Sequence, residues 1–223
     1  NISKNILYFV LFEKEHFILL FQKGEKYVHK TIKNKKYVSV SAQYYGLAFA
    51  NYMDKKYSNG LAALSKISDP EYKEHPAILS LQAQLYAALN NFAAANKIYT
   101  HGLDTYPTYK NLWLGQVNVY MQFKQFSMAD KRLDDLSQSY PNDNDIWSLM
   151  AKVNSDSILN NEQKYYYALG NQQYIVANYR GALDQYMQAL KSRKKADSVL
   201  SDIISAKIVD TQAMIKLNHY YDG

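Results

Sequence analysis

Two stretches of the chain decide its fold: FAAANKIYTHGLDTYP at residues 92–107 and FSMADKRLDDLSQSYP at residues 126–141. They superpose at an offset of 34 residues, and the matching pairs are Phe92 with Phe126, Ala95 with Ala129, Pro107 with Pro141 and Trp113 with Trp147. Because the chain has only 2 Trp and 4 Pro, coincidence of these rare residues at one offset indicates an internal repeat.

A period of 34 residues is typical of the tetratricopeptide repeat (TPR), in which each unit is a pair of antiparallel helices, A and B. Where the two helices cross, their backbones approach closely and small residues are required. The small residues at these positions are Ala48, Ala83, Ala151 and Gly170 on helix A, with Val117 as a departure, and Gly60, Ala95, Ala129 and Ala182 on helix B. The pattern therefore predicts helical hairpins with close crossings.

Large residues occupy the remaining columns of the repeat. Helix A opens with a large apolar residue, an aromatic follows the turn between the helices, and a large residue closes the core of helix B. The opening residues of helix A are Tyr44, Leu79, Trp113, Trp147 and Tyr166. The aromatics after the turn are Tyr57, Phe92, Phe126 and Tyr179, and the closing residues of helix B are Leu64, Tyr99, Leu133 and Tyr186. Proline cannot continue a helix, so Pro107 and Pro141, with Pro70 slightly early, are expected to end helix B.

The sequence thus predicts an all-α fold, a right-handed TPR α-solenoid of antiparallel helix pairs with a C-terminal capping helix. The predicted parts are an N-terminal helical pair at 1–40, TPR units at about 41–74, 76–109 and 110–143, a half-unit at 144–160, a unit at 163–194, and the capping helix and tail at 195–223.

Two of these parts depart from a regular array. Residues 144–160 are interpreted as an unpaired helix A, with the helix at 162–177 serving both as its partner and as the opening helix of the next unit. Exposed solenoid ends must be covered, and the stretch at 198–217 is predicted to do this with one apolar face. That face is predicted to contain Val199, Ile203, Ala206 and Val209 or Ala213.

Composition narrows the function. The net charge is +6, but Arg occurs only at Arg132, Arg180 and Arg193, which argues against nucleic-acid binding because Arg makes the better phosphate and base contacts. With 0 Cys, the chain has no disulfide, thiolate zinc site or cysteine nucleophile. The apolar segment at 6–21 is interrupted by charged residues and is too short for a membrane span. No convergent catalytic group is evident, so no catalytic residue and no metal ligand is predicted.

The arrangement resembles the C-terminal repeat region of exported bacterial zinc metallopeptidases of the β-barrel assembly-enhancing protease type. Three stretches carry the resemblance: AQYYGLA at 42–48 followed by Lys56-Tyr57, Trp147 in its unpaired helix closed by Leu159-Asn160-Asn161, and YYALG at 166–170 through YRGAL at 179–183. It implies a periplasmic or otherwise exported protein concerned with envelope protein quality control, in which a catalytic domain with a zinc-binding HExxH helix precedes the repeats.

No HExxH motif occurs in this chain, since none of its 5 His lies four residues from another. No cofactor is therefore expected in the chain, and zinc is expected in the upstream catalytic domain of the parent protein. The start at Asn1, without a visible signal peptide, is interpreted as the start of a fragment.

The predicted functional surface is the concave groove lined by the A helices, which would hold a protein or peptide partner. The candidate groove residues are Tyr45, Phe49, Tyr52, Ser80, Gln84, Asn111, Leu114, Asn118, Met121, Lys152, Tyr167, Asn171 and Tyr174. The alternative interpretation is that they are ordinary helix residues and that Tyr45, Phe49 and Tyr52 cover the N-terminal helices. A carboxylate clamp, which needs Lys at the positions of Tyr45, Ser80, Leu114, Ser148 and Tyr167, is disfavoured.

The favoured function is a non-catalytic region that recruits a substrate or partner, or contacts its own upstream peptidase domain. The alternative is a stand-alone TPR scaffold or co-chaperone with no protease attached. The sequence of the gene upstream of Asn1 discriminates between them.

Overall fold

The computed structural model describes residues 30, 32–34, 39–192 and 197–221, and helix is the regular secondary structure throughout these ranges. The predicted N-terminal pair at 1–40 and the apolar segment at 6–21 lie almost wholly outside the described residues. The chain divides into two compact units, Asn1–Val119 and Tyr120–Gly223, and each is described by itself.

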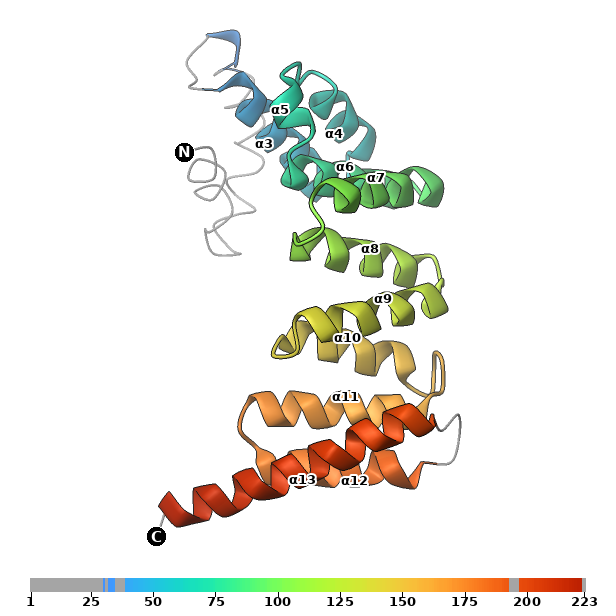
Figure 1. Cartoon of the computed structure of the whole chain (residues 1–223). Helices are drawn as coiled ribbons and strands as arrows, with labels where there is room; N and C mark the ends of the chain where they lie inside the picture. The colour runs from blue at the N-terminus through green and yellow to red at the C-terminus, as the bar shows by residue number, and fades with distance from the viewer. Residues whose placement is uncertain (1–29, 31, 35–38, 193–196, 222–223) are drawn as a thin grey trace. The chain divides into compact units, whose positions relative to one another are not determined.

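Unit 1 is built from paired helices that contact in sequence order (Figure 1). Its elements are α3 (Val40–Met53), α4 (Tyr57–Leu64), α5 (Pro70–Lys73), α6 (Pro76–Ala88), α7 (Phe92–Thr105) and the first part of α8 (Lys110–Gln122). Helix α3 packs on α4, α4 on α6, and α6 on α7.

Unit 2 repeats this arrangement and adds a long last helix (Figure 1). Its complete helices are α9 (Phe126–Ser139), α10 (Asn144–Asn154), α11 (Glu162–Ile175), α12 (Tyr179–Lys191) and α13 (Ser198–Tyr221). Helix α11 packs on both α10 and α12, while α13 packs on α12. The all-α, TPR-type fold class predicted from the repeat is confirmed.

The turn between paired helices has one recurring backbone feature. The residue immediately before each N-cap has a left-handed conformation, and these residues are Lys55, Asn90, Lys124, Asn160 and Ala177. At three of the turns an Asn side chain then caps the second helix: Asn91 accepts from the amide of Ala94, Asn161 from Lys164, and Asn178 from Gly181. Such caps satisfy otherwise unpaired helix amides, which fixes where the second helix begins.

The columns of small residues lie in the interior, as the crossing geometry requires. Ala48, Ala83, Ala95 and Ala129 have no exposed surface. Gly170 is the most demanding of these positions, because a Cβ there would collide with the ring of Tyr186. Small residues at the crossings bury little apolar surface. Large side chains packed beside them, such as Leu133, each contribute about 2 kcal/mol to stability.

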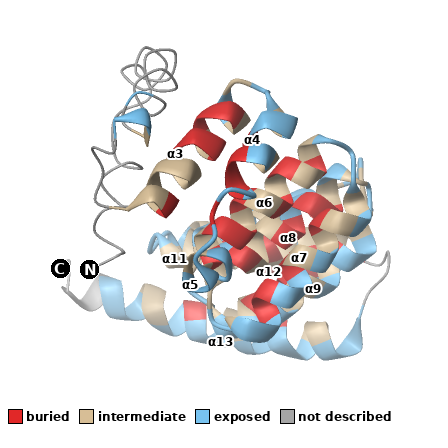
Figure 2. Ribbon diagram, turned by 90° about the horizontal axis from the view of Figure 1, so that it is seen from above, coloured by how far each residue is buried: buried red, intermediate tan, exposed pale blue. Residues whose placement is uncertain are grey.

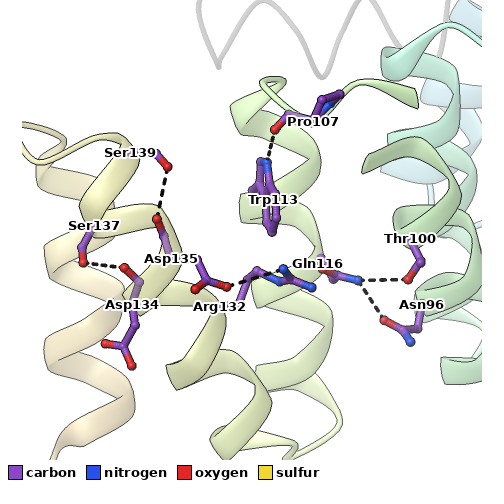
Figure 3. Close-up of polar contacts among 10 residues, drawn as sticks. All are labelled: Asn96, Thr100, Pro107, Trp113, Gln116, Arg132, Asp134, Asp135, Ser137 and Ser139. Atoms are coloured by element: carbon purple, nitrogen blue, oxygen red, sulfur yellow. Dashed lines mark hydrogen bonds and ion pairs between the residues drawn. The ribbon is translucent and has the colours of Figure 1, made fainter. Parts of the chain in front are cut away.

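Prolines lie both at the N-terminal ends of helices and just after their C-terminal ends. Helices α7 and α9 end just before Pro107 and Pro141, whose carbonyl oxygens accept hydrogen bonds from the indole nitrogens of Trp113 (2.7 Å) and Trp147 (2.8 Å). Figure 3 shows the first of these bonds. Because the same bond recurs 34 residues later, it explains why Trp and Pro repeat together. The prediction that Pro70 ends helix B was wrong: α4 ends at Leu64, and Pro70 is the first residue of α5.

The predicted packing face of the capping helix was also wrong. Val199, Ile203 and Val209 are exposed, by 67%, 45% and 67%, and most of α13 is coloured as exposed in Figure 2. The inner face is one position along: Leu200, Ile204 and Ile208 pack against Tyr186 and its neighbours. Helix α13 has two apolar stripes, and polar contacts select between them, since Gln163 bonds both Ser201 (2.8 Å) and the backbone of Asp197 (2.7 Å).

Candidate protein-interaction surface

Three aromatic residues form a stripe along α3 in unit 1. Tyr45, Phe49 and Tyr52 follow the spacing that places side chains on one helix face, and all three are half-buried. They pack against the core formed by α3, α4 and α6 while keeping part of each ring accessible. We call these three residues the α3 aromatic stripe.

The hydroxyl groups of the stripe have no hydrogen-bond partner among the residues that the structure describes. Burial, followed by the nearby Tyr109, raises the pKa of Tyr45. Burial and Tyr57, whose ring centroid lies 6.0 Å from that of Tyr52, raise the pKa of Tyr52. Both phenols are therefore neutral at physiological pH and able to donate a hydrogen bond.

Residues of α6 lie close to the hydroxyl group of Tyr99, which comes from α7. The Tyr99 hydroxyl donates to the carbonyl oxygen of Ser80 (3.5 Å), and the Gln84 side chain donates to the Ser80 hydroxyl (3.1 Å). Burial raises the pKa of Tyr99 to about 12, and Tyr52 adds a smaller contribution in the same direction. The structure thus brings predicted residues of α3 and α6 near one another around Tyr99.

The first part of α8 completes this side of unit 1. A Cβ on Gly115 would collide with the Tyr99 ring, so α8 approaches α7 closely at this glycine. The buried Gln116 side chain donates to Asn96 (3.0 Å) and Thr100 (3.4 Å) of α7, which fixes the rotation of α8 (Figure 3). The predicted residues Asn111 and Asn118 are exposed, and Leu114 is half-buried.

In unit 2, the predicted groove residues of α11 take part in an internal network. The ring of Tyr167 packs edge-on against Trp147, at 5.5 Å between centroids, and lies 6.2 Å from the ring of Tyr186. Asn171 accepts a hydrogen bond from the Tyr186 hydroxyl (3.2 Å) and donates to the carbonyl of Tyr167 (2.8 Å). Asn171 is only 4% exposed, so its placement on the groove surface is corrected: it satisfies a buried tyrosine.

Tyr174 contacts the capping helix. Its hydroxyl donates to the carboxylate of Asp210 (2.7 Å), and the Lys207 ammonium lies 5.1 Å from its ring centroid. The hydrogen bond to Asp210, with burial and nearby charges, raises the pKa of Tyr174 to about 12. This side chain therefore holds α13 against α11. The other predicted residues of this unit are Lys152, which is exposed on α10, and Met121, which is half-buried near the end of α8.

A buried lysine is the main feature that sequence reasoning missed. The Lys164 ammonium on α11 lies 2.8 Å from a carboxylate oxygen of Asp130 and 2.5 Å from one of Asp134, both on α9. Asn154 of α10 also donates to Asp130 (2.6 Å). Burial raises the pKa of Asp134, and the Lys164 ammonium opposes that shift.

This cluster ties three helices together, because Lys164 of α11 and Asn154 of α10 both contact Asp130 of α9. The sequence offers one signal for this cluster, which is the spacing of Asp130 and Asp134. They are four residues apart and therefore share a helix face. Their partner lies two helices away, and no local pattern identifies it.

The comparison with protein families agrees with this architecture. Residues 86–153 match the sequence model described as tetratricopeptide repeat. No curated protein sequence matches the chain significantly. The chain therefore contains a TPR region, and TPR repeats indicate a protein–protein interaction domain.

In the described ranges, no helix is long and apolar enough to cross a bilayer. Among the same residues, no group of three or more His, Cys, Asp or Glu side chains is arranged to hold a metal ion.

Proposed function

We propose that this chain is a non-catalytic TPR region that binds a protein or peptide partner through the face of unit 1 that carries the α3 aromatic stripe. The single observation that carries the proposal is the state of the stripe. Its three rings are half-buried and lie in a row, and the two tyrosine hydroxyl groups have no partner among the described residues. Rings that are accessible and hydroxyls that are unused are suited to a partner that supplies both apolar and polar contacts.

The chemistry of the face defines the class of ligand. Ser80, Gln84, Asn111 and Asn118 are neutral and polar, and Leu114 adds apolar surface. Such a face favours a segment with apolar or aromatic anchors at helical or extended spacing. It does not favour a strongly charged tail, because no Lys or Arg stands at the groove positions of α3, α6 or the first part of α8.

A pair of matched variants tests this face without disturbing the core. Asn118→Glu places a charge on the proposed face at an exposed position, while Asn59→Glu makes the same change at an exposed position on α4. The chain is used to capture partners from its native extract, and the captured proteins are identified by mass spectrometry. Asn118→Glu should weaken capture of the principal partner about tenfold, the cost of one misplaced charge, and Asn59→Glu should leave it unchanged.

The stripe itself is tested by the triple change of Tyr45, Phe49 and Tyr52 to Ser. Capture should be lost while the far-ultraviolet circular dichroism stays helical. Capture that survives both the triple change and Asn118→Glu would remove this face from the binding site.

The parent protein is proposed to be an exported zinc metallopeptidase of the bacterial periplasm, with its zinc in a catalytic domain upstream and this region recruiting substrate or an assembly partner. The proposal rests on the three stretches of resemblance and on the TPR region. The gene sequence upstream of Asn1 tests it directly, since a signal peptide and HExxH are expected there. A start codon immediately before Asn1 would leave the alternative, a stand-alone TPR scaffold or co-chaperone.

A further inference from the structure

Apolar residues recur along the outward face of α13. Its residues follow steps of three and four, the spacing of a single helix face. We call this set the outer ridge, and it consists of Val199, Ile203, Ala206, Val209, Ala213 and Leu217, all of which are exposed. A row of exposed apolar side chains along one helix is suited to contact with another protein surface.

The outer ridge is independent of the face that packs on unit 2. Leu200, Ile204 and Ile208 face the core, and Tyr174 holds Asp210 from the side. The ridge therefore stays available while α13 covers the end of α11 and α12.

The length of α13 gives a second clue. The helix has 24 residues, whereas α11 has 14 and α12 has 13. Figure 1 shows its C-terminal end projecting past the ends of both helices. Ala213 and Leu217 of the ridge belong to the C-terminal half of this helix.

We propose that the outer ridge pairs with the outer ridge of a second copy of this chain, antiparallel, about a two-fold axis near Val209. In this arrangement the C-terminal half of one α13 lies along the N-terminal half of the other. Each ridge is then covered by the other, and the two interfaces are identical, as two-fold symmetry requires.

The register follows from residues spaced evenly about Val209. Asp202 lies seven residues before Val209 and Lys216 seven residues after it, and both are exposed. Antiparallel pairing at Val209 places each Asp202 beside the Lys216 of the second copy. Parallel pairing would instead place like charges side by side, which is unfavourable.

The apolar residues fit the same register. Ala206 and Ala213 lie three residues before and four residues after Val209, so the small residues of the two copies meet near the axis and let the backbones approach. Ile203 lies six residues before Val209 and Leu217 lies eight residues after it. The Ile203 of one copy therefore packs near the Leu217 of the other, farther from the axis. Charge and size therefore select one pairing.

The strength of the pairing follows from its size. A 24-residue helix is about 36 Å long, and a single helix pair buries less surface than a stable dimer usually needs. The dimer should therefore be weak and dependent on concentration.

Sedimentation equilibrium of the full chain tests the proposal. The wild-type protein should shift from 25.8 kDa towards twice that mass as its concentration rises. Val209→Asp would place two carboxylates at the axis and should keep the protein monomeric at every concentration. Val176→Asp is the matched control, because Val176 is 64% exposed and follows the end of α11 rather than belonging to the ridge, and it should dimerise as the wild type does.

Charge exchange distinguishes self-pairing from any other occupant. Asp202→Lys and Lys216→Asp should each weaken the dimer about tenfold, since each change spoils two symmetric pairs. The double variant should recover the wild-type affinity, which only an antiparallel second copy explains.

A cysteine variant gives an independent measurement, because the chain has 0 Cys. On oxidation, Val209→Cys should form a disulfide-linked dimer at least about tenfold faster than Val176→Cys, since only cysteines held close can join. A chain that stays monomeric at all concentrations, or a dimer indifferent to both Val209→Asp and the charge exchange, would overturn the proposal. Either result would leave the ridge to another segment or another protein.

Discussion

Units 1 and 2 use the same repeat positions differently. In unit 1 the tyrosines of the α3 aromatic stripe have hydroxyl groups without a described partner. In unit 2, Tyr174 donates to Asp210, and Asn171 accepts from Tyr186. The position of a residue in the repeat therefore fixes which way it faces, whereas its neighbours decide whether it is free to bind. The chain has one tryptophan in each unit, so single-tryptophan variants can follow the two units separately.

The largest expected loss of stability comes from a substitution that disrupts the packing of unit 2. Gly170→Val would drive a side chain into the ring of Tyr186, which is fully buried and has no room to move. We expect a loss of about 3 kcal/mol in the free energy of unfolding. The measurement is urea unfolding followed by Trp147 fluorescence in a Trp113→Phe background.

The same substitution should leave unit 1 largely intact if the two units are separately stable. Trp113 fluorescence in a Trp147→Phe background reports this. Equal losses at both tryptophans would show that the units unfold as one.

The second effect concerns the ion pairs that occur in unit 2. Lys164→Met leaves Asp130 and Asp134 facing each other without their ammonium, at side-chain exposures of 19% and 45%. We expect a loss of about 2 kcal/mol, below the range for fully buried pairs because solvent screens Asp134. Thermal unfolding measures it.

Arg132→Met is the matched control. Arg132 contacts the exposed Asp135 at 3.7 Å (Figure 3), and such surface pairs contribute less than about 1 kcal/mol. Losses of the same size in the two variants would contradict the structural role given to Lys164.

The third effect is a pH dependence at the contact between α11 and α13. The pKa of Tyr174 is about 12 in the folded chain, compared with about 10 in an unfolded one. Because the folded pKa is the higher, the contact between Tyr174 and Asp210 contributes stability that is fully present below pH 10. That stability is lost as the pH rises through 12.

Tyr174→Phe should remove that contribution and cost about 1 kcal/mol at neutral pH, the usual value of one hydrogen bond. Subtracting the variant's stability profile from that of the wild type between pH 9 and pH 12 cancels the titration of Tyr99, which is present in both. A flat difference would show that the bond to Asp210 contributes nothing.

The smallest effect is a gain in stability. Ala177 has φ of 58°, in the left-handed region that favours glycine. Ala177→Gly should therefore stabilise unit 2 by about 0.5–1 kcal/mol, whereas Ala62→Gly, on the exposed face of α4, should cost about as much. Calorimetry of the two variants checks the opposite signs.

The sequence predicts much of this fold because its signals are local. Paired columns such as Ala95 with Ala129 and Phe92 with Phe126 mark equivalent positions of successive hairpins, and the structure buries both alanines. The face of α13 was not predictable in this way. Its two apolar stripes are equally periodic, and the choice between them depends on Gln163 and Tyr174, which lie in a helix far away in the sequence.

The candidate site was predictable only as a set of positions. The repeat places Tyr45 and Tyr167 at matching positions, but the sequence does not say that Trp147 and Tyr186 pack around Tyr167. The ion pairs of Lys164 were not predictable for the same reason, since Asp130 and Asp134 are brought close to it only by the packing of α9, α10 and α11. Long-range neighbours are set by tertiary packing, and periodicity does not identify them.

Photo-crosslinking from α3 tests the central claim most directly. A photoreactive phenylalanine analogue replaces Tyr52 in one variant and Asn59, on α4, in another, and each is irradiated in the cells from which the chain comes. We predict that one partner protein is crosslinked from position 52, with little or none from position 59. Equal capture from both positions, or none from position 52, would contradict the account.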